Sequence, residues 1–409
     1  MKKTRLVQIG AGGYGEFYME QYLSGAHENI TLAGVVDPFI DRCSTHDTLL
    51  AQGIPIFDDL EAFYAGHSAE LAVIASPIHF HMPQTIVALQ NGSHVLCEKP
   101  LGATWQEVRQ MIDARDAANR FVAIGFQASF STPVQQLKAD IMSGRFGAPK
   151  RLKTIALWRR FNGYYERASW GGQLRRPGGD WVLDSPANNA TAHYLHNSLY
   201  VIGPAVDRSA TPATVSAELY RANEITSFDT VAARIATTEG VEILFYTSHA
   251  ADGEENLGPV FHYEFEDATV QYELDSPIVA RHNGEVIETY GDPSEGSACK
   301  LIAAADAAAG NRAILCGPEA AGMQTLCING MHESMPNICE WPAELITIGN
   351  LEEEHSEQYR QVTGLQQVLK ACYDQNQLPS ECGTPWAVAG DTVDMSGYEA
   401  FPRDPARFP

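Results

Sequence analysis

A glycine-rich turn between an expected strand and an expected helix constrains this chain more than any other feature. The sequence Gly10-Ala-Gly-Gly-Tyr-Gly15 follows the apolar run Arg5–Ile9 and precedes Glu16–Leu23, which has helical character. In such a unit the first glycine makes a tight turn, the second lets backbone approach a pyrophosphate, and the last lets helix and strand pack closely. Free N–H groups at the helix start attract the phosphate charge. We therefore expect a bound dinucleotide, contacted by Gly10, Gly12, Gly13, Tyr14 and Gly15.

An acidic residue ends the second expected strand. Thr31–Val36 leads into Asp37, about twenty residues past the turn, where a dinucleotide-binding unit places the acid for the ribose hydroxyls. The residue after Asp37 is a proline and not a basic residue, so a 2′-phosphate would be repelled. The sequence therefore favours NAD over NADP as the cofactor.

Strands and helices alternate up to residue 125 and predict an α/β domain over residues 1–125. The expected strands are Leu6–Ile9, Thr31–Val36, Leu71–Ala75, His94–Cys97 and Phe121–Ile124, with helices such as Gln84–Asn91 and Trp105–Ala118 between them. This order indicates a doubly wound parallel sheet, whose ligands bind beyond the carboxyl ends of the strands. The glycine turn, Asp37, Ser76-Pro77 and Glu98-Lys99 all fall at such ends, so one cleft could hold them together.

The pattern changes after Gly125 and predicts an α+β domain over residues 126–409 with an open, mainly antiparallel sheet. The expected strands are Lys153–Arg160, Val215–Arg221, Asp229–Thr237, Val241–Ser248, His262–Glu266 and Ala268–Glu273. The expected helices are Pro133–Ser143, Asn188–Ile202, Glu319–Ser334 and His355–Asn376, before an irregular tail from Leu378. Because wide sheets are usually covered, we expect the open face to form the interface of a homodimer or homotetramer.

Composition and charge narrow the class of protein. A length of 409 residues suits two domains, and a net charge of −23 argues against nucleic acid, whose binding relies on basic surface. No apolar run is long enough to span a membrane, and the start of the chain has no cleavable apolar segment. The eight cysteines show no zinc-binding spacing. We therefore expect a cytoplasmic protein that binds no metal ion.

Four motifs together resemble the glucose–fructose oxidoreductase and inositol dehydrogenase family (Gfo/Idh/MocA). They are Gly10–Gly15, Ser76-Pro77 with His81 four residues after the proline, Glu98-Lys99-Pro100, and Gly178-Gly179 leading to Asp184. The resemblance implies a Rossmann domain followed by an α/β domain, and NAD(P)-dependent oxidation of a sugar or cyclitol hydroxyl. It implies that Ser76, Pro77 and His81 contact the cofactor, that Glu98 contacts the nicotinamide-side ribose, and that Lys99 hydrogen-bonds the reacting hydroxyl.

The general base is displaced from the family pattern, in which an aspartate is followed four residues later by a histidine and then, three residues further on, by a second aspartate. Asp184 stands behind the glycine pair, but Asn188 occupies the histidine position. Counting back from Gly203 instead gives His193 as the histidine, with Asn189 and His196 at the two aspartate positions. We predict His193 as general base, because imidazole has a near-neutral pKa. A helix histidine held by a neighbour is the alternative. Asp184 completes the predicted catalytic group, and Asn189 and His196 are predicted substrate contacts.

The loop from Trp158 to Trp181 is the clue to the substrate. It combines aromatic residues with five arginines, a local reversal of charge on an acidic chain. Aromatic faces stack on sugar rings, and guanidinium groups hold hydroxyls or carboxylates. We predict substrate contacts from Arg159, Tyr165, Arg167 and Trp170, and a carbohydrate that is anionic or heavily hydroxylated. An oligomer contact is the alternative, since interfaces favour the same residue types.

The main functional hypothesis is an NAD-dependent oxidoreductase that oxidises a ring hydroxyl of a sugar, sugar acid or cyclitol by hydride transfer. The alternative is a glycosidase that retains NAD and works by transient oxidation, elimination, hydration and re-reduction. A third possibility is a redox sensor or scaffold that binds NAD without turnover, although the presence of Lys99 and His193 argues against it.

Overall fold

The computed structural model describes residues 3–294, 296–350 and 357–408, and the chain divides into two compact units. The first contains Met1–Phe130 and Gly296–Gly322, and the second contains Ser131–Glu295 and Met323–Pro409. The expected boundary after residue 125 placed residues 296–322 in the second domain. They return to the first unit because the alanine-rich helix α9 (Cys299–Ala308) packs on the parallel sheet and buries its apolar side chains there.

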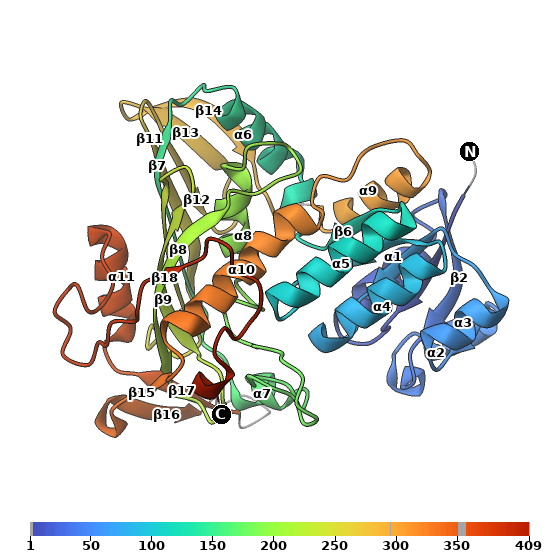
Figure 1. Ribbon diagram of the computed structural model, residues 1–409, viewed down its shortest axis with the longest axis horizontal. Coiled ribbons are helices and arrows are strands. Elements are labelled where there is room, and N and C mark those ends of the chain that lie inside the picture. Colours follow the sequence, from blue (N-terminus) through green and yellow to red (C-terminus); the bar gives the residue numbers. More distant parts are fainter. Residues whose placement is uncertain (1–2, 295, 351–356, 409) are drawn as a thin grey trace. The chain divides into compact units, whose positions relative to one another are not determined.

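The first unit is built on a six-stranded parallel sheet in the order β3-β2-β1-β4-β5-β6. Figure 1 labels two of these strands, β2 and β6. Its strands are β1 (Thr4–Ile9), β2 (Ile30–Val36), β3 (Ile56–Phe57), β4 (Leu71–Ile74), β5 (His94–Cys97) and β6 (Val122–Ile124). The strands are buried and apolar, as expected of a parallel sheet covered by helices. The strand order reverses between β1 and β4, and ligands of doubly wound sheets bind at such a switch point. The predicted fold class of this unit is confirmed.

Helices connect the strands of the first unit. They are α1 (Tyr14–Leu23), η1 (Ile40–Arg42), α2 (His46–Ala51), α3 (Leu60–Gly66), α4 (Ile78–Gln90), α5 (Trp105–Ala118) and η2 (Gln127–Phe130). Helix α5 has the predicted bounds, and Thr104 with Glu107 forms a capping box at its start. Helix α4 begins six residues earlier than predicted and continues through Pro83.

The second unit contains a ten-stranded mixed sheet in the order β14-β13-β12-β11-β7-β10-β9-β8-β15, with β18 paired to β8. Its strands are β7 (Pro149–Leu157), β8 (Pro212–Arg221), β9 (Thr230–Thr237), β10 (Glu242–Ser248), β11 (Leu257–Phe265), β12 (Thr269–Glu273), β13 (Ile278–His282), β14 (Glu285–Gly291), β15 (Cys339–Glu340) and β18 (Val393–Asp394). Most pairs are antiparallel, as predicted, but β10 runs parallel to β7. The β13–β14 hairpin was missed, although Asn283-Gly284, with φ of 50° and 86°, is a strong hairpin turn.

The helices of the second unit and its C-terminal segments complete the fold. They are α6 (Thr132–Met142), α7 (Asn162–Glu166), α8 (Ala192–Val201), η3 (Ala343–Leu345), α11 (Leu365–Gln375) and η4 (Pro405–Arg407), and helix α10 (Pro318–Ser334) crosses the boundary between the units. Strands β16 (Ile346–Asn350) and β17 (Gln358–Val362) form a separate hairpin. Within the described residues, none of the helices is both long and apolar enough to cross a membrane.

Two predicted helices of the second unit are corrected. Residues 355 and 356 of the predicted helix His355–Asn376 lie outside the described residues, and Gln358–Val362 is strand β17. The helix begins only after Gly364, whose φ of 78° is unsuitable for a helix interior. The helix predicted from Asn188 begins at Ala192, because Asn188 and Thr191 are held in turns by hydrogen bonds to Ser185 and Pro186.

Candidate active site

The glycine turn after β1 has the shape that a pyrophosphate requires. A Cβ atom on Gly10 would lie 2.9 Å from the main chain of Ala75, and one on Gly15 would lie 2.3 Å from the carbonyl oxygen of Gly10. These two glycines allow close packing, whereas a Cβ on Gly13 would meet nothing within 4 Å. Within the described residues, no side chain caps α1, which starts at Tyr14. The open face of the turn and the uncapped helix end together fit a dinucleotide phosphate.

Asp37 is held beside this turn at the end of β2. Its Oδ2 accepts a hydrogen bond from the Ala11 N–H at 2.8 Å, and its Oδ1 accepts one from the Phe39 N–H at 2.9 Å. Each carboxylate oxygen can accept a further hydrogen bond, so the group remains able to bind ribose hydroxyls. The Arg42 guanidinium lies over the Phe39 ring at 4.8 Å.

The predicted cofactor residues after β4 and β5 are joined through His81. Its Nδ1 lies 2.7 Å from the carbonyl oxygen of Pro100, and its Nε2 lies 2.8 Å from that of Ser76. The ring is buried, and burial lowers the pKa of His81. The Ser76 hydroxyl donates to Gln84 Oε1 at 2.6 Å. His81 therefore ties together the two loops that carry Ser76-Pro77 and Glu98-Lys99-Pro100.

Glu98 sits in a buried polar cluster with a residue that sequence reasoning missed. Lys300 of α9 is fully buried, and its Nζ lies 2.5 Å from Glu98 Oε1, 3.0 Å from the Tyr14 hydroxyl and 3.3 Å from the Gly125 carbonyl oxygen. The Tyr18 hydroxyl donates to Glu98 Oε1 at 2.6 Å. Burial disfavours the charge on Lys300, but Glu98 and Tyr14 outweigh it, so the pKa of Lys300 is raised. The cluster fixes the Glu98 carboxylate.

Lys99 follows immediately, half-buried at the carboxyl end of β5. Strands β1 and β5 are the two neighbours of β4 and run parallel to it. The glycine turn and Lys99 therefore lie at the same edge of the sheet, as the sequence predicted. An ammonium group at this edge can donate a hydrogen bond to a substrate oxygen and stabilise negative charge that develops on it.

Four predicted residues of the second unit share one cluster around Asp184. Asp184 is buried, and its carboxylate accepts hydrogen bonds from the Gly172 N–H at 2.7 Å and from the Asn189 side-chain amide at 2.8 Å. Arg167 Nη2 lies 3.6 Å from Asp184 Oδ2. The Trp170 ring lies 4.9 Å from the guanidinium carbon of Arg167. The structure thus brings Asp184, Asn189, Arg167 and Trp170 together.

The remaining predicted residues of the second unit have other surroundings. His193 is half-buried in the first turn of α8. His196 is buried and stacked on the Tyr200 ring at 5.4 Å, where burial and then Lys138 lower its pKa to about 3. Arg159 donates to Gln361 Oε1 at 2.9 Å and lies over the Tyr359 ring. The contacts of His196 and Arg159 lie outside the Asp184 cluster, and their substrate roles remain predictions.

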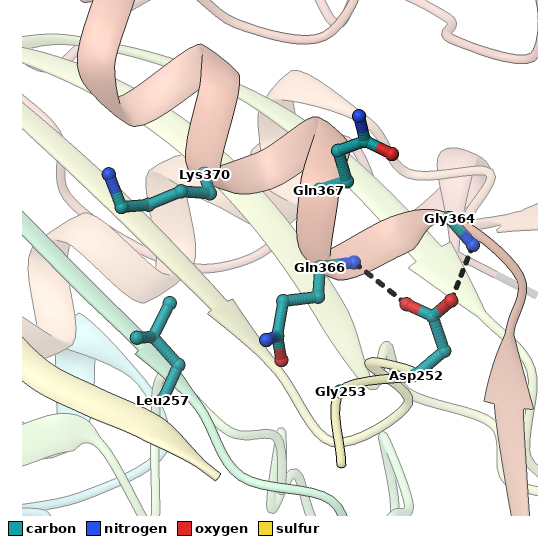
Figure 2. Close-up of a pocket in the computed structure, with 7 residues that line it drawn as sticks. All are labelled: Asp252, Gly253, Leu257, Gly364, Gln366, Gln367 and Lys370. Atoms are coloured by element: carbon teal, nitrogen blue, oxygen red, sulfur yellow. Dashed lines mark hydrogen bonds between the residues drawn. The ribbon is translucent and has the colours of Figure 1, made fainter. Parts of the chain in front are cut away.

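A cavity of about 450 Å³ in the second unit is lined by none of these residues, although Arg159 donates to the carbonyl oxygen of Gly253 at its wall at 3.2 Å. It is lined by Asp252, Gly253, Leu257, Gly364, Gln366, Gln367 and Lys370, as Figure 2 shows. The carboxylate of Asp252 accepts hydrogen bonds from the Gly364 N–H at 2.6 Å and the Gln366 N–H at 3.1 Å, and so occupies the start of α11. Because this carboxylate already satisfies those N–H groups, the cavity is a poor site for an anionic ligand.

Comparison with known proteins agrees with the geometry of the first unit. Residues 4–126 match the model of the Gfo/Idh/MocA family, described as an oxidoreductase family with an NAD-binding Rossmann fold. The matched segment contains all six strands of the parallel sheet, and over this segment the chain is similar to that family. The match agrees with the resemblance drawn from the three motifs that lie within it, and its description gives NAD as the cofactor of the fold.

Curated relatives match part of the chain. D-glucoside 3-dehydrogenase from Escherichia coli K12 is 28% identical over 145 residues, which cover 35% of this chain and 40% of the relative. Inositol 2-dehydrogenase from Rubrobacter xylanophilus is 25% identical over 238 residues, covering 56% of this chain and 62% of the relative. The matched segments thus span less than two thirds of these relatives.

A solved structure of similar fold covers more of the chain. The WlbA dehydrogenase from Bordetella pertussis, in complex with NADH and UDP-GlcNAcA, superimposes with a TM-score of 0.67. The match covers 82% of this chain and 97% of that one, at 20% sequence identity. At this identity the likeness shows the fold, and it confirms a Rossmann unit combined with a mainly antiparallel second sheet.

Proposed function

We propose that the protein is an NAD-dependent dehydrogenase that oxidises a ring hydroxyl of a sugar, sugar acid or cyclitol. The observation that carries the proposal is Lys99, half-buried beside the fixed carboxylate of Glu98 and at the same sheet edge as the glycine turn. The names of the relatives, a glucoside dehydrogenase and an inositol dehydrogenase, support a hydroxyl-bearing ring as the substrate.

In the proposed enzyme, some residues of the first unit bind the cofactor and another contacts the reacting oxygen. The turn from Gly10 to Gly15 would hold the pyrophosphate, Asp37 the adenosine ribose and Glu98 the nicotinamide-side ribose. NAD bound there supplies the hydride acceptor. The ammonium group of Lys99 donates a hydrogen bond to the reacting oxygen and stabilises the negative charge that develops on it.

The second unit supplies the proposed general base. As a hydride leaves the carbinol carbon, the hydroxyl proton must be taken up, and we assign this step to the imidazole of His193. The substrate would leave as a ketone and His193 would hold the hydroxyl proton, while bound NAD would supply the acceptor for the two electrons and the hydrogen. Asp184, whose carboxylate is fixed by Gly172, Asn189 and Arg167, would position the segment that leads into α8.

The dehydrogenase is favoured over the NAD-retaining glycosidase that the sequence left open. The curated relatives reported above are named as dehydrogenases. We further propose a cytoplasmic homodimer or homotetramer, and the assembly proposal rests on the open second sheet that the sequence predicts. Sedimentation of the purified protein measures the assembly.

The test is NAD reduction with a panel of ring substrates. The full-length protein is incubated with NAD and matched neutral sugars, uronic acids and cyclitols, and reduced nicotinamide is followed by absorbance. We expect turnover with at least one ring alcohol, and loss of that turnover in His193→Asn. Release of a free sugar from a glycoside without net NADH formation would instead establish the glycosidase, and wild-type rates in His193→Asn would remove this base.

A further inference from the structure

The parallel pair β7 and β10 of the second sheet brings a further histidine beside the arginine-rich loop. Strands β7 and β10 are paired up to Leu157 and Ser248. The chain continues the pairing beyond the strands, since the Arg160 N–H donates to the carbonyl oxygen of His249 at 3.1 Å. Because carboxyl ends of parallel strands meet at one edge of a sheet, Arg160 and His249 are neighbours although they are far apart in the sequence.

His249 is buried but not fully hydrogen-bonded. Its side chain is 1% exposed, and its Nδ1 lies 3.3 Å from the Tyr165 hydroxyl. Burial, followed by Arg160 and Arg167, lowers the pKa of His249 well below its usual value, so the ring is neutral near pH 7. When the Tyr165 hydroxyl donates to Nδ1, the ring proton is on Nε2. Among the described residues, Nε2 has no hydrogen-bond partner, and such an orphaned buried group is costly unless a ligand satisfies it.

Arg160 and Arg167 converge on the same aromatic ring. Their guanidinium carbons lie 5.0 and 3.9 Å from the centre of the Tyr164 ring, and this ring meets the His249 ring edge-on at 5.2 Å. Arg167 is paired with Asp184. Arg160 forms no ion pair within the described residues, and its Nε is buried without a hydrogen-bond partner there. Arg160 therefore has no carboxylate partner of its own among the described residues.

The other three arginines of the loop are already engaged. Arg159 donates to Gln361, Arg175 lies 3.5 Å from the centre of the Trp181 ring, and Arg176 forms an ion pair with Asp180. The sequence presents five equivalent arginines, but the structure leaves Arg160 and Arg167 as the two that share a cluster. On a chain with a net charge of −23, a local positive site is needed for an anion to bind at all.

We propose that Arg160, Arg167 and Nε2 of His249 form a subsite that binds the carboxylate of an acidic sugar. The inference rests on the proposed function, because it specifies the substrate class of that enzyme. A guanidinium fork matches the planar carboxylate with two parallel hydrogen bonds, and the histidine N–H provides a third donor. The Tyr164 ring keeps the two guanidinium groups oriented and excludes water from one side of them.

The test compares matched sugars that differ only in charge. Titration calorimetry on the full-length protein with NADH measures D-glucuronate against D-glucose and D-galacturonate against D-galactose. We expect the uronate of at least one pair to bind more tightly. Arg160→Gln and Arg167→Gln should each weaken that binding by about tenfold to a hundredfold, the range for charged hydrogen bonds, and the neutral sugar by less than about threefold. Arg176→Gln, in the same loop, is the matched control and should change neither.

If Arg160 had only a structural role, the results would differ. Arg160→Gln would then lower the melting temperature and weaken the binding of both sugars equally. Arg160→Lys, which keeps the charge but loses the fork, should retain the fold and still bind the uronate less tightly than the wild type. Equal affinity for uronate and neutral sugar in every pair overturns the proposal. Tighter binding of glucose 6-phosphate, with the same sensitivity to Arg160→Gln, overturns the carboxylate assignment.

The outcomes also separate this inference from the proposed function. NAD reduction by ring alcohols, together with uronate binding that is unaffected by Arg160→Gln, leaves the dehydrogenase standing and removes the subsite. Uronate binding that depends on Arg160, without NAD reduction by any sugar, leaves the subsite standing and removes the dehydrogenase.

Discussion

Lys300 and Glu98 form a buried ion pair across 202 residues of sequence, with 2.5 Å between Nζ and Oε1. The pair ties α9, in a segment that returns to the first unit, to the end of β5. The same lysine also donates to the Tyr14 hydroxyl at the glycine turn. One buried cation therefore connects the two motifs that bind the cofactor in our proposal.

The first prediction concerns the stability that this pair supplies. Lys300→Met leaves the Glu98 carboxylate buried with only the Tyr18 hydroxyl as a side-chain partner, so we expect a loss of about 3–5 kcal/mol in the free energy of unfolding of the first unit. The double variant Glu98→Gln with Lys300→Met should lose less than the sum of the single variants, because it leaves no unpaired charge. Urea unfolding measures both effects.

The control for this experiment is an exposed lysine. Lys370 pairs with Asp374 on the surface of α11, and Lys370→Met should change stability by no more than about 0.5 kcal/mol. An unchanged urea midpoint in Lys300→Met would show that the buried pair contributes no net stability.

The second prediction concerns the choice of cofactor. The Asp37 carboxylate is fixed by the Ala11 and Phe39 N–H groups and would meet a 2′-phosphate with like charge. We expect the wild type to bind NADH more tightly than NADPH, and Asp37→Ser to bind NADH more weakly and to lose most of this preference. Fluorescence titration with both nucleotides measures the two affinities. Equal affinity of the wild type for both would contradict the assignment.

The third prediction separates cofactor binding from chemistry. Lys99→Met should lower the rate of NAD reduction by about two to four powers of ten, because the developing negative charge on the substrate oxygen loses its hydrogen-bond donor. NADH affinity should stay within about threefold of the wild type, since the glycine turn and Asp37 are untouched. The Lys370→Met variant is again the control. A folded Lys99→Met protein with a near-normal rate would exclude Lys99 from the reaction.

The sequence predicted the first unit well because its signals are local. Strand His94–Cys97 and helix Trp105–Ala118 have the predicted bounds, since apolar runs and caps specify them within a few residues. The position of Lys300 beside Glu98 depends on a contact between distant segments, and local signals in the sequence could not predict it. The one available hint was a single lysine in a mostly apolar, alanine-rich stretch, which argues for a buried charge with a dedicated partner.

The arginine-rich loop shows the same limit at the candidate substrate site. Adjacent residues such as Arg159 and Arg160 are indistinguishable in the sequence, yet they face different partners once the strand they follow has been placed. His249 directly follows a strand that the sequence predicted, but its position beside Arg160 follows from the parallel pairing of β7 and β10. The sequence predicted that consecutive strands pair in antiparallel fashion, and this prediction did not place His249 beside Arg160.

The fourth prediction concerns acid sensitivity of the second unit. His332 of α10 is buried between the rings of Phe228 and Phe401, and burial lowers its pKa to about 3. In the unfolded chain the His332 imidazole binds a proton near pH 6.5, whereas in the folded protein it binds one only near pH 3. The stability from the neutral ring is therefore complete above about pH 6.5 and is lost as the pH falls below it, by about 1.4 kcal/mol per pH unit.

In His332→Phe this proton is absent from both states, so the free energy of unfolding should fall less steeply between about pH 6 and 5. Urea unfolding across this range measures the slope, and identical slopes for the variant and the wild type would show that His332 is protonated in the folded protein.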